Sequence, residues 1–336
     1  MVFFSMNRSG RLRGVKLGAL GFDDCSNPIM LNHLVTEVQR YGRNIYDSNG
    51  QNKLDPRTVE AFMTSGINPW SALSMADLMN TMERPMVAAE TYTTALNDFS
   101  KYPYFLRANY DLQNVSMAFI NIAKRNGWKY MQVVHEDSIW GEETYQVLMK
   151  IAAQEGICIV ASFGLNDGNA EDVVMGLRGR RDVQPVVLFL MHDSFRTFMQ
   201  GVVTLNASYE FQFLSNLGNS KSAVAGFEDY LNGMLSFEFW TGITTSVLAE
   251  FQTYLRNIDA STYTTNPWFQ EWYESLMGCS FTPTGTQMAC GTDNMFTGLS
   301  GFNYELDTDV TSVVYGVIAI AQGLDATLEK YCGVGK

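Results

Sequence analysis

Apolar residues in the middle of the chain recur at helical spacing, and between these segments they gather into short continuous runs. Spacings of three and four residues predict one apolar face of a helix, formed by Leu112, Val115, Phe119 and Ile122. Buried strands are predicted over Trp128–Val134 and Ile157–Ser162, with a loop over Asp137–Trp140 and a helix that Gly156 ends. This order predicts a parallel sheet covered by helices, and ligands of such sheets bind beyond the carboxyl ends of the strands.

The alternation of strands and helices extends over the rest of the chain. Strands are predicted at residues 16–20, 59–63, 86–89, 186–191, 211–215 and 235–240. Helices are predicted at residues 71–82, 171–177, 194–203, 247–255 and 309–324, with others opening at Pro28 and Pro267, and a polar loop at 49–56. The pattern predicts an α/β fold with two Rossmann-like, doubly wound lobes.

The predicted lobes are discontinuous in sequence. One comprises residues 1–108 and 237–336, and the other comprises residues 109–236. The chain crosses between them near residues 107–111 and again near 235–238. Crossings of this kind form a hinge and permit two lobes to close on a ligand.

Composition narrows the classes of function. The chain has 336 residues, 46% of them hydrophobic, and a net charge of −12. This charge argues against nucleic acid and anionic membranes as partners, because the chain has no basic block to release counterions. No run reaches the ~18 apolar residues of a membrane helix, and no signal peptide is visible at the start.

The candidate chemistry is sparse. None of the five cysteines has the spacing of a metal site, so we expect no metal or other cofactor, and Cys279 and Cys290 are near enough to close a short loop. Glycosylation triplets at Asn7, Asn114 and Asn206 are consistent with an extracellular chain. We find no serine nucleophile elbow, phosphate-binding loop, dinucleotide fingerprint or zinc-protease motif, so we do not expect an enzyme.

Several segments resemble one receptor family. They are YPYFLR at 102–107, VVHEDSIWGEETY at 133–145, AQEGICI at 153–159 and NPWFQEWY at 266–273, with shorter matches at Asp24-Cys25-Ser26 and Asn303-Tyr304. Together they resemble the extracellular ligand-binding module of metabotropic glutamate receptors, which are class C G-protein-coupled receptors. The resemblance covers roughly residues 15–332.

The resemblance implies a two-lobed "Venus flytrap" of the type I periplasmic-binding-protein class, which binds a small amino-acid-like ligand between its lobes. It implies a position at the extracellular face of the plasma membrane and a homodimer or heterodimer. Helix 71–82 is a candidate part of the dimer face, and the alternative is that its apolar residues are ordinary core. The family's cysteine-rich and seven-helix membrane domains are missing here, so we expect the chain to be a fragment.

The family also suggests how the cysteines pair. Cys279 and Cys290 resemble the family's local disulfide. Cys25 would pair upstream of this chain, Cys158 with the cysteine-rich domain, and Cys332 just beyond Lys336. The alternative for Cys158 is a buried strand thiol, which is common in protein cores.

In this family, hydroxyl and backbone groups of the first lobe hold the ligand's carboxylate, acids hold its amine, and an aromatic ring covers it. Carried over, these roles fall on Ser71, Thr93 or Thr94, Asp111 and Trp140. Each has a structural alternative: Asp111 can cap the helix that begins at Leu112, and Trp140 can be a packing residue. Near Ser71, backbone N–H groups at a helix start could also bind a carboxylate by donating to its oxygens, although Pro69 removes one such donor.

Two departures from the family concern charge. The acid expected in the second lobe is replaced in the run that contains Asn216, and the lysine expected in the first lobe is Asp309. A negative charge at that position would repel a distal carboxylate. We therefore expect a neutral or cationic amino-acid-like ligand, or none, rather than glutamate in the usual geometry. A solute-binding protein or the ectodomain of a guanylyl cyclase receptor are alternatives with the same fold, and the AQEGIC and NPWFQEW segments favour the glutamate-receptor branch.

Overall fold

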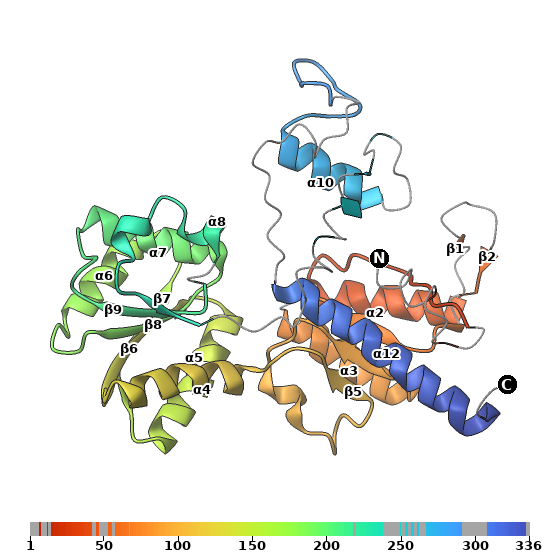
Figure 1. The fold of residues 1–336 in the computed structure, drawn as a ribbon, viewed down its shortest axis with the longest axis horizontal. Helices are drawn as coiled ribbons and strands as arrows, with labels where there is room; N and C mark the ends of the chain where they lie inside the picture. Colours follow the sequence, from red (N-terminus) through yellow and green to blue (C-terminus); the bar gives the residue numbers. More distant parts are fainter. Residues whose placement is uncertain are drawn as a thin grey trace.

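The computed structural model describes residues 15–41, 45–46, 53–55, 58–66, 68–217, 220–237, 267–290 and 308–333, together with residues 7, 12, 249, 253–254, 257–258 and 261. Its strands form a five-stranded sheet, a three-stranded sheet and a small two-stranded sheet. The two larger sheets are parallel and each carries its own helices (Figure 1). The chain therefore has the predicted α/β fold class.

The five-stranded sheet has the strand order β10-β9-β8-β6-β7. Its strands are β6 (Tyr130–Glu136), β7 (Cys158–Leu165), β8 (Pro185–Phe189), β9 (Gln212–Ser215) and β10 (Leu235–Ser236). Its main helices are α4 (Leu112–Arg125), α5 (Ile139–Gln154), α6 (Ala170–Arg178) and α7 (His192–Thr204). Shorter turns follow at α8 (Lys221–Val224) and η4 (Glu228–Tyr230). We call this assembly the five-stranded unit.

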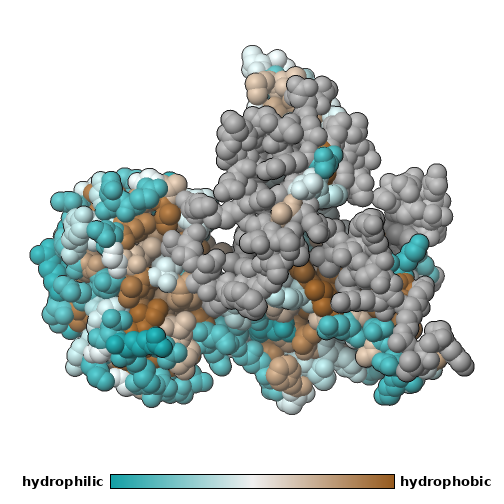
Figure 2. All heavy atoms as spheres, in the orientation of Figure 1, coloured by the Kyte–Doolittle hydropathy of each residue, from teal (hydrophilic) through white to brown (hydrophobic). Residues whose placement is uncertain are grey.

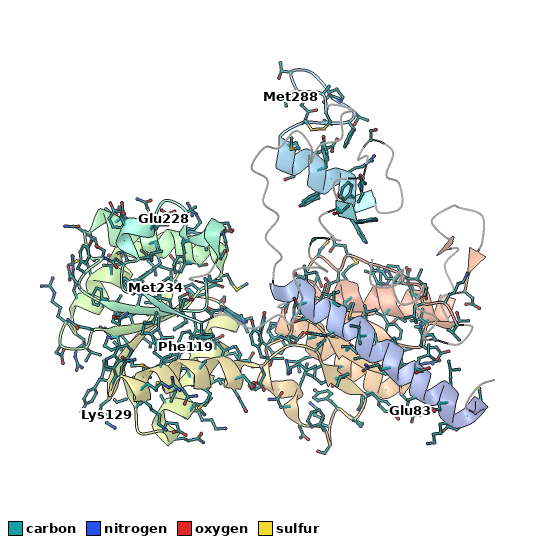
Figure 3. The ribbon with its side chains drawn as sticks, in the orientation of Figure 1. Glu83, Phe119, Lys129, Glu228, Met234 and Met288 are labelled. Carbon is teal, nitrogen blue, oxygen red and sulfur yellow. A yellow bond between two sulfur atoms is a disulfide. The ribbon has the colours of Figure 1, made fainter. Side chains whose placement is uncertain are left out.

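Both faces of the five-stranded sheet are buried. Helices α4 and α5 cover one face, and α6 and α7 cover the other (Figure 1). Neighbouring strand residues alternate between the two cores: Val133 packs with Phe119 of α4, whereas Val134 packs with Phe198 of α7. Figure 3 labels Phe119 at the α4 face. Burial on both faces explains why the strands read as continuous apolar runs.

A buried glutamine ties one loop to this sheet. The amide of Gln132 in β6 is fully buried and donates to the carbonyl oxygens of Leu177, Arg180 and Val183 at 3.3, 3.3 and 2.8 Å. These carbonyls belong to the end of α6 and the turn that leads to β8. The side chain therefore adds to the turn's own backbone hydrogen bonds, in which the N–H of Arg180 donates to Leu177 O at 3.1 Å and the N–H of Val183 donates to Arg180 O at 2.9 Å.

The three-stranded sheet has the order β3-β4-β5. Its strands are β3 (Phe62–Thr64), β4 (Met86–Ala88) and β5 (Phe105–Arg107). Around it lie α2 (Pro28–Thr36), which continues into the π-turn η1 (Glu37–Tyr41), α3 (Pro69–Met82), the 3-10 helix η3 (Thr94–Asn97) and α12 (Thr308–Cys332). We call this assembly the three-stranded unit.

The faces of β4 alternate in the same way. Met86 and Ala88 join the core formed with Met79 of α3 and Leu96 of η3. On the other face α12 packs closely, because a Cβ at Gly316 would lie 3.3 Å from Val87. Since Met79 is fully buried, it cannot form part of a dimer surface, and the core alternative holds for this residue.

Several predicted elements differ from the observed ones. The predicted strand at 16–20 has no regular secondary structure, because the backbone of Leu17 bonds the side-chain amide of Asn7 in both directions (2.9 and 2.8 Å) instead of a neighbouring strand. Within the predicted loop at 49–56, β2 (Lys53–Leu54) pairs with β1 (Ile45–Tyr46). Most other boundaries shift by one to three residues.

The final helix is longer than expected. It runs to Cys332 rather than residue 324, and its stretch Val310–Cys332 is long and apolar enough to cross a membrane, with a mean hydropathy of 1.3. This corrects the expectation of no such segment, although one such helix is weak evidence for a membrane span. Here Thr311, Val317 and Ala321 are buried against the three-stranded unit.

Towards the C-terminal part, α10 (Pro267–Met277) begins at the predicted proline. Directly after α10, Cys279 and Cys290 form the expected disulfide. This disulfide closes a loop, and Met288 lies near the tip of that loop (Figure 3). Cys25, Cys158 and Cys332 are exposed free thiols. The alternative of a buried Cys158 thiol is therefore wrong. The predicted helix at 247–255 and residues 238–240 lie almost wholly outside the described residues.

Candidate functional site

The three parallel strands β3, β4 and β5 end side by side. The N–H of Ala89 donates to Thr64 O at 2.9 Å, and the N–H of Ala108 donates to Ala88 O at 2.8 Å. The segments that follow the strands therefore share one edge of the sheet. This is the edge at which parallel α/β sheets bind ligands.

Arg107 at the end of β5 organises the segment that follows β4. Its guanidinium donates to the carbonyl oxygen of Thr91, to Thr93 O at 2.7 Å and to Asn97 Oδ1 at 3.1 Å. Burial lowers the pKa of Arg107, while the negative charges of Asp111 and Glu143 act in the opposite direction. These hydrogen bonds engage the Arg107 guanidinium and fix the conformation of residues 91–97.

Asp111 caps a helix, as its structural alternative predicted. Its Oδ1 accepts from the backbone N–H of Asn114 at 3.0 Å, at the first turn of α4. Its Oδ2 accepts from the side-chain amide of Asn97 at 2.6 Å, and the residue is 9% exposed. Both oxygens therefore take part in joining α4 to η3, and the pairing of Asp111 with a ligand amine remains a prediction.

Thr93 and Thr94 bind a carboxylate of the chain itself. The hydroxyl of Thr93 donates to Glu143 Oε1 at 2.7 Å, and the backbone N–H of Thr94 donates to the same oxygen at 3.2 Å. The sequence analysis did not single out Glu143. An acid in the first turn of a helix is common, because the helix dipole favours it there, and so it gives no reason to expect a contact with another segment. The available signal was its position one turn after Trp140, which places both on one side of α5.

Ser71 lies in the first turn of α3 and is 8% exposed. The backbone N–H groups of Trp70 and Ser71 donate to Asn68 Oδ1 at 2.9 and 3.4 Å, so Asn68 caps the helix. These N–H groups therefore donate to a cap that the chain itself supplies, and their donation to a ligand carboxylate remains a prediction. The Ser71 hydroxyl is buried and has no hydrogen-bond partner.

Among the residues that the structure describes, other buried polar groups around this edge also lack hydrogen-bond partners. They are the hydroxyls of Thr64 and Thr311, the amide of Asn109 and the indole N–H of Trp140. Buried polar groups in proteins nearly always have partners, so each such group needs an explanation. Together with Ser71 they form a set of neutral donors and acceptors, which we call the unpaired polar set.

The positions of this set follow from the fold. Thr64 ends β3, Asn109 lies two residues beyond β5, and Thr311 lies in the first turn of α12. Trp140 lies in the first turn of α5, whose Ser138 cap follows β6. Sequence reasoning found Ser71 and Trp140 by family resemblance. It missed the other three, which could have been found as polar residues at strand ends and helix starts.

The remaining predicted site residues are more loosely placed. Asn216 directly follows β9 at the carboxyl edge of the five-stranded sheet and is half-buried. Asp309 lies in the first turn of α12, but its side chain is outside the described residues. Among the glycosylation triplets, Asn114 and Asn206 are exposed, whereas the amide of Asn7 bonds Leu17.

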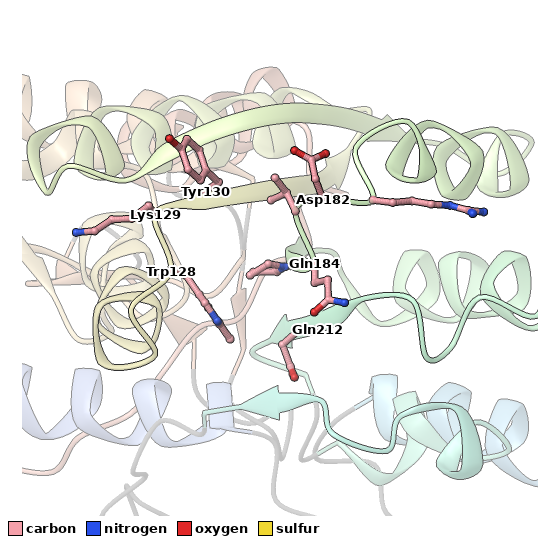
Figure 4. Close-up of a pocket in the computed structure, with 9 residues that line it drawn as sticks. Trp128, Lys129, Tyr130, Asp182, Gln184 and Gln212 are labelled. Carbon is pink, nitrogen blue, oxygen red and sulfur yellow. The ribbon is translucent and has the colours of Figure 1, made fainter.

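A cavity of about 460 Å³ lies at the opposite end of the five-stranded unit (Figure 4). Its lining comes from the amino ends of β6, β8 and β9, and includes Trp128, Lys129, Tyr130, Gln184 and Gln212. None of the predicted ligand residues contributes to it. It is therefore separate from the carboxyl edge at which the unpaired polar set lies.

The fold has parallel sheets in two units with polar groups at their carboxyl edges, which is the arrangement in which α/β proteins bind ligands. The chain belongs to the family described as "Receptor family ligand binding region", whose model matches residues 4–334. It is similar to a metabotropic glutamate receptor of Drosophila melanogaster, with 23% identity over 304 residues. The match covers 84% of this chain and 31% of that receptor, so the chain spans about a third of its relative.

These comparisons confirm the predicted resemblance to metabotropic glutamate receptors. The matched family is one of receptor ligand-binding regions, in agreement with the expected ligand-binding domain. The relative is longer than this chain, which is consistent with further domains in the whole protein.

Proposed function

We propose that the chain is the ligand-sensing ectodomain of a class C G-protein-coupled receptor and binds an amino-acid-like small molecule between its two units. The lobes would be residues 1–108 with 237–336 and residues 109–236. The unpaired polar set carries this proposal. Its members come from both units, and a ligand bound between the units would give them the hydrogen bonds that buried polar groups need.

The charges near this edge favour a particular ligand class. Arg107 is engaged by residues 91–97, and Thr93 and Thr94 bind Glu143. Asp309 stands in the sequence where the family has a lysine. A ligand with a second carboxylate would thus meet acids and no available cation among these residues. The site suits a neutral or cationic amino acid or amine, and not glutamate in the usual geometry.

The similarity to a metabotropic glutamate receptor suggests the wider role of the chain in signalling. Closure of the units on a ligand would re-orient a homodimer or heterodimer at the extracellular face of the plasma membrane. A membrane domain beyond this chain would then transmit the signal. The alternative of a solute-binding protein is less favoured, because the resemblance is to a receptor over 84% of the chain.

The test is a thermal-shift screen against neutral, basic and acidic amino acids and biogenic amines. A ligand at 100 times its dissociation constant should stabilise the folded protein by about 2.7 kcal/mol. We expect a shift with a neutral or basic compound and none with glutamate. A shift with glutamate would refute the charge argument, and no shift with any compound would refute the amino-acid-like ligand.

Two variants locate the site. Ser71→Ala removes a hydroxyl of the unpaired polar set and should abolish most of the ligand shift, while leaving the ligand-free melting temperature nearly unchanged because that hydroxyl has no partner to lose. Ser222→Ala is the matched control, since Ser222 is exposed on the five-stranded unit. An equal ligand shift in both variants would place the ligand elsewhere.

A further inference from the structure

We propose that Glu143 is a latch that holds the five-stranded unit against the three-stranded unit. The latch thereby sets the position of Trp140 relative to the carboxyl edge of the three-stranded sheet, where the proposed ligand binds. Its significance for signalling rests on the proposed function. The contact itself does not, because it consists of two hydrogen bonds between residues of the chain.

The two ends of the contact belong to different units. Glu143 lies on α5, which packs against the five-stranded sheet through Leu148 and Ile151. Thr93 and Thr94 open η3, whose Leu96 is buried in the core of the three-stranded unit. The carboxylate therefore links two separate hydrophobic cores. It does so next to the segment where the chain crosses between them, since Arg107 of that segment binds Thr93 O.

The carboxylate end is rigidly mounted. Gly141 lies so close to β6 that an added Cβ would be 2.0 Å from the carbonyl oxygen of Glu136. Ser138 caps the same turn, with its Oγ accepting from the N–H of Gly141 at 3.1 Å. The first turn of α5 is thus fixed to the end of β6, and it carries Trp140 and Glu143 on one side.

The threonine end is held as firmly. Arg107 binds the carbonyl oxygen of Thr93 at 2.7 Å, and Thr93 is 3% exposed. Glu143 is half-buried and accepts from both a hydroxyl and a backbone N–H. Hydrogen bonds to a charged acceptor between two fixed and largely buried partners are stronger than those of exposed, mobile pairs.

The neighbouring glutamate provides an internal comparison. Glu142 is exposed and accepts from the side chain of Gln146 on the same helix at 2.7 Å. It has the same charge and lies on the same turn, but it makes a contact within α5 only. If Glu143 acts as a latch, its substitution should have an effect that substitution of Glu142 does not. A general effect of charge on the helix would be the same for both substitutions.

The experiment compares the ligand-free wild-type chain with Glu143→Gln, Glu143→Ala and the control Glu142→Gln. Small-angle X-ray scattering measures the separation of the units, and hydrogen exchange measures protection of the Thr94 amide. We expect both Glu143 variants to show a larger radius of gyration and at least roughly tenfold faster exchange at Thr94, because a charge-assisted hydrogen bond is lost. Glu142→Gln should match the wild type.

Unchanged scattering and unchanged Thr94 exchange in a folded Glu143 variant would overturn the latch. If Glu143→Ala does not fold, Thr93→Val removes the hydroxyl from the other side and should produce the same expansion. Because no ligand is added, failure of the latch is distinguishable from failure of the ligand screen. A protein that binds amino acids but shows no expansion keeps the proposed function and loses the latch.

Discussion

At the scale of single residues, the fold takes up several polar side chains that the family resemblance assigned to a ligand. Asp111 caps α4 and binds Asn97, and Thr93 binds Glu143. The sequence could predict the cap, because an N-cap lies next to the helix that it serves. It could not predict contacts between residues 14 or 50 positions apart, since these depend on how the units meet.

The pair formed by Arg178 and Glu210 gives a prediction for pH. Arg178 Nε lies 2.9 Å from Glu210 Oε2, and these hydrogen bonds lower the pKa of Glu210 below its ordinary value of 4.5. A folded-state pKa below the unfolded value means that the pair stabilises the protein above pH 4.5, and that this contribution is lost as the pH falls through the folded-state pKa.

We therefore expect Glu210→Gln to lower the urea midpoint at pH 7 by a modest amount, and to have no effect at a pH below the folded-state pKa. Glu171→Gln is the control, because Glu171 is exposed on α6. A destabilisation by Glu210→Gln that is equal at both pH values would show that packing, and not charge, is responsible.

At the scale of elements, periodicity was a reliable guide in the five-stranded unit. Helix 112–125 begins at the predicted residue, and β6, β7, β8 and β9 overlap the predicted strands. The strand predicted at 16–20 was wrong, and the backbone N–H and carbonyl of Leu17 bond the side chain of Asn7, which lies outside that segment. A short apolar run shows that a strand is possible, but it does not show whether a neighbouring strand is available.

The packing of α5 onto β6 gives the prediction at this scale. Gly141→Ala would place a Cβ 2.0 Å from Glu136 O, so α5 must shift away from the sheet. Overpacking of this kind costs about 1–3 kcal/mol of unfolding free energy, and a clash with backbone belongs at the upper end. Chemical denaturation measures this cost.

Gly168→Ala is the matched control for that substitution. The nearest atom to a Cβ at Gly168 is 3.8 Å away, which is ordinary contact. The unfolded-chain effect of Gly→Ala is stabilising and should be similar in both variants. If Gly141→Ala therefore costs no more stability than Gly168→Ala, the close approach of α5 to β6 is not a source of strain. A shift of α5 should also weaken the bonds of Glu143 to Thr93 and Thr94.

At the scale of the whole molecule, two groups of elements lie side by side, and hydrophilic side chains cover much of the outer rim of the five-stranded unit (Figures 1 and 2). Each unit has its own buried cores. The ring of Phe237 packs on Phe119 at 4.8 Å, so the five-stranded unit extends at least to residue 237. The division of the chain into two lobes remains a prediction.

That division, 109–236, predicts that the second lobe folds alone when Phe237 is kept with it, giving a fragment of residues 109–237. The fragment contains all five strands of its sheet and the helices on both faces, so it buries two complete cores. We expect a cooperative urea transition, and amide protection in β6 and β8 like that of the full chain. A fragment that unfolds without a cooperative transition would show that the two units depend on each other for stability.

The sequence by itself determined the fold class, the order of most elements, the resemblance to metabotropic glutamate receptors and the disulfide between Cys279 and Cys290. These depend on local periodicity, on short motifs and on residues close in the chain. Only the tertiary structure decided that Glu143 binds Thr93 and Thr94 and that the guanidinium of Arg107 binds residues 91–97. It also decided that, among the described residues, polar groups at the end of β3, after β5 and at three helix starts lack hydrogen-bond partners. Hydrogen-bond partners are settled by three-dimensional distance and burial, which separation along a chain does not encode.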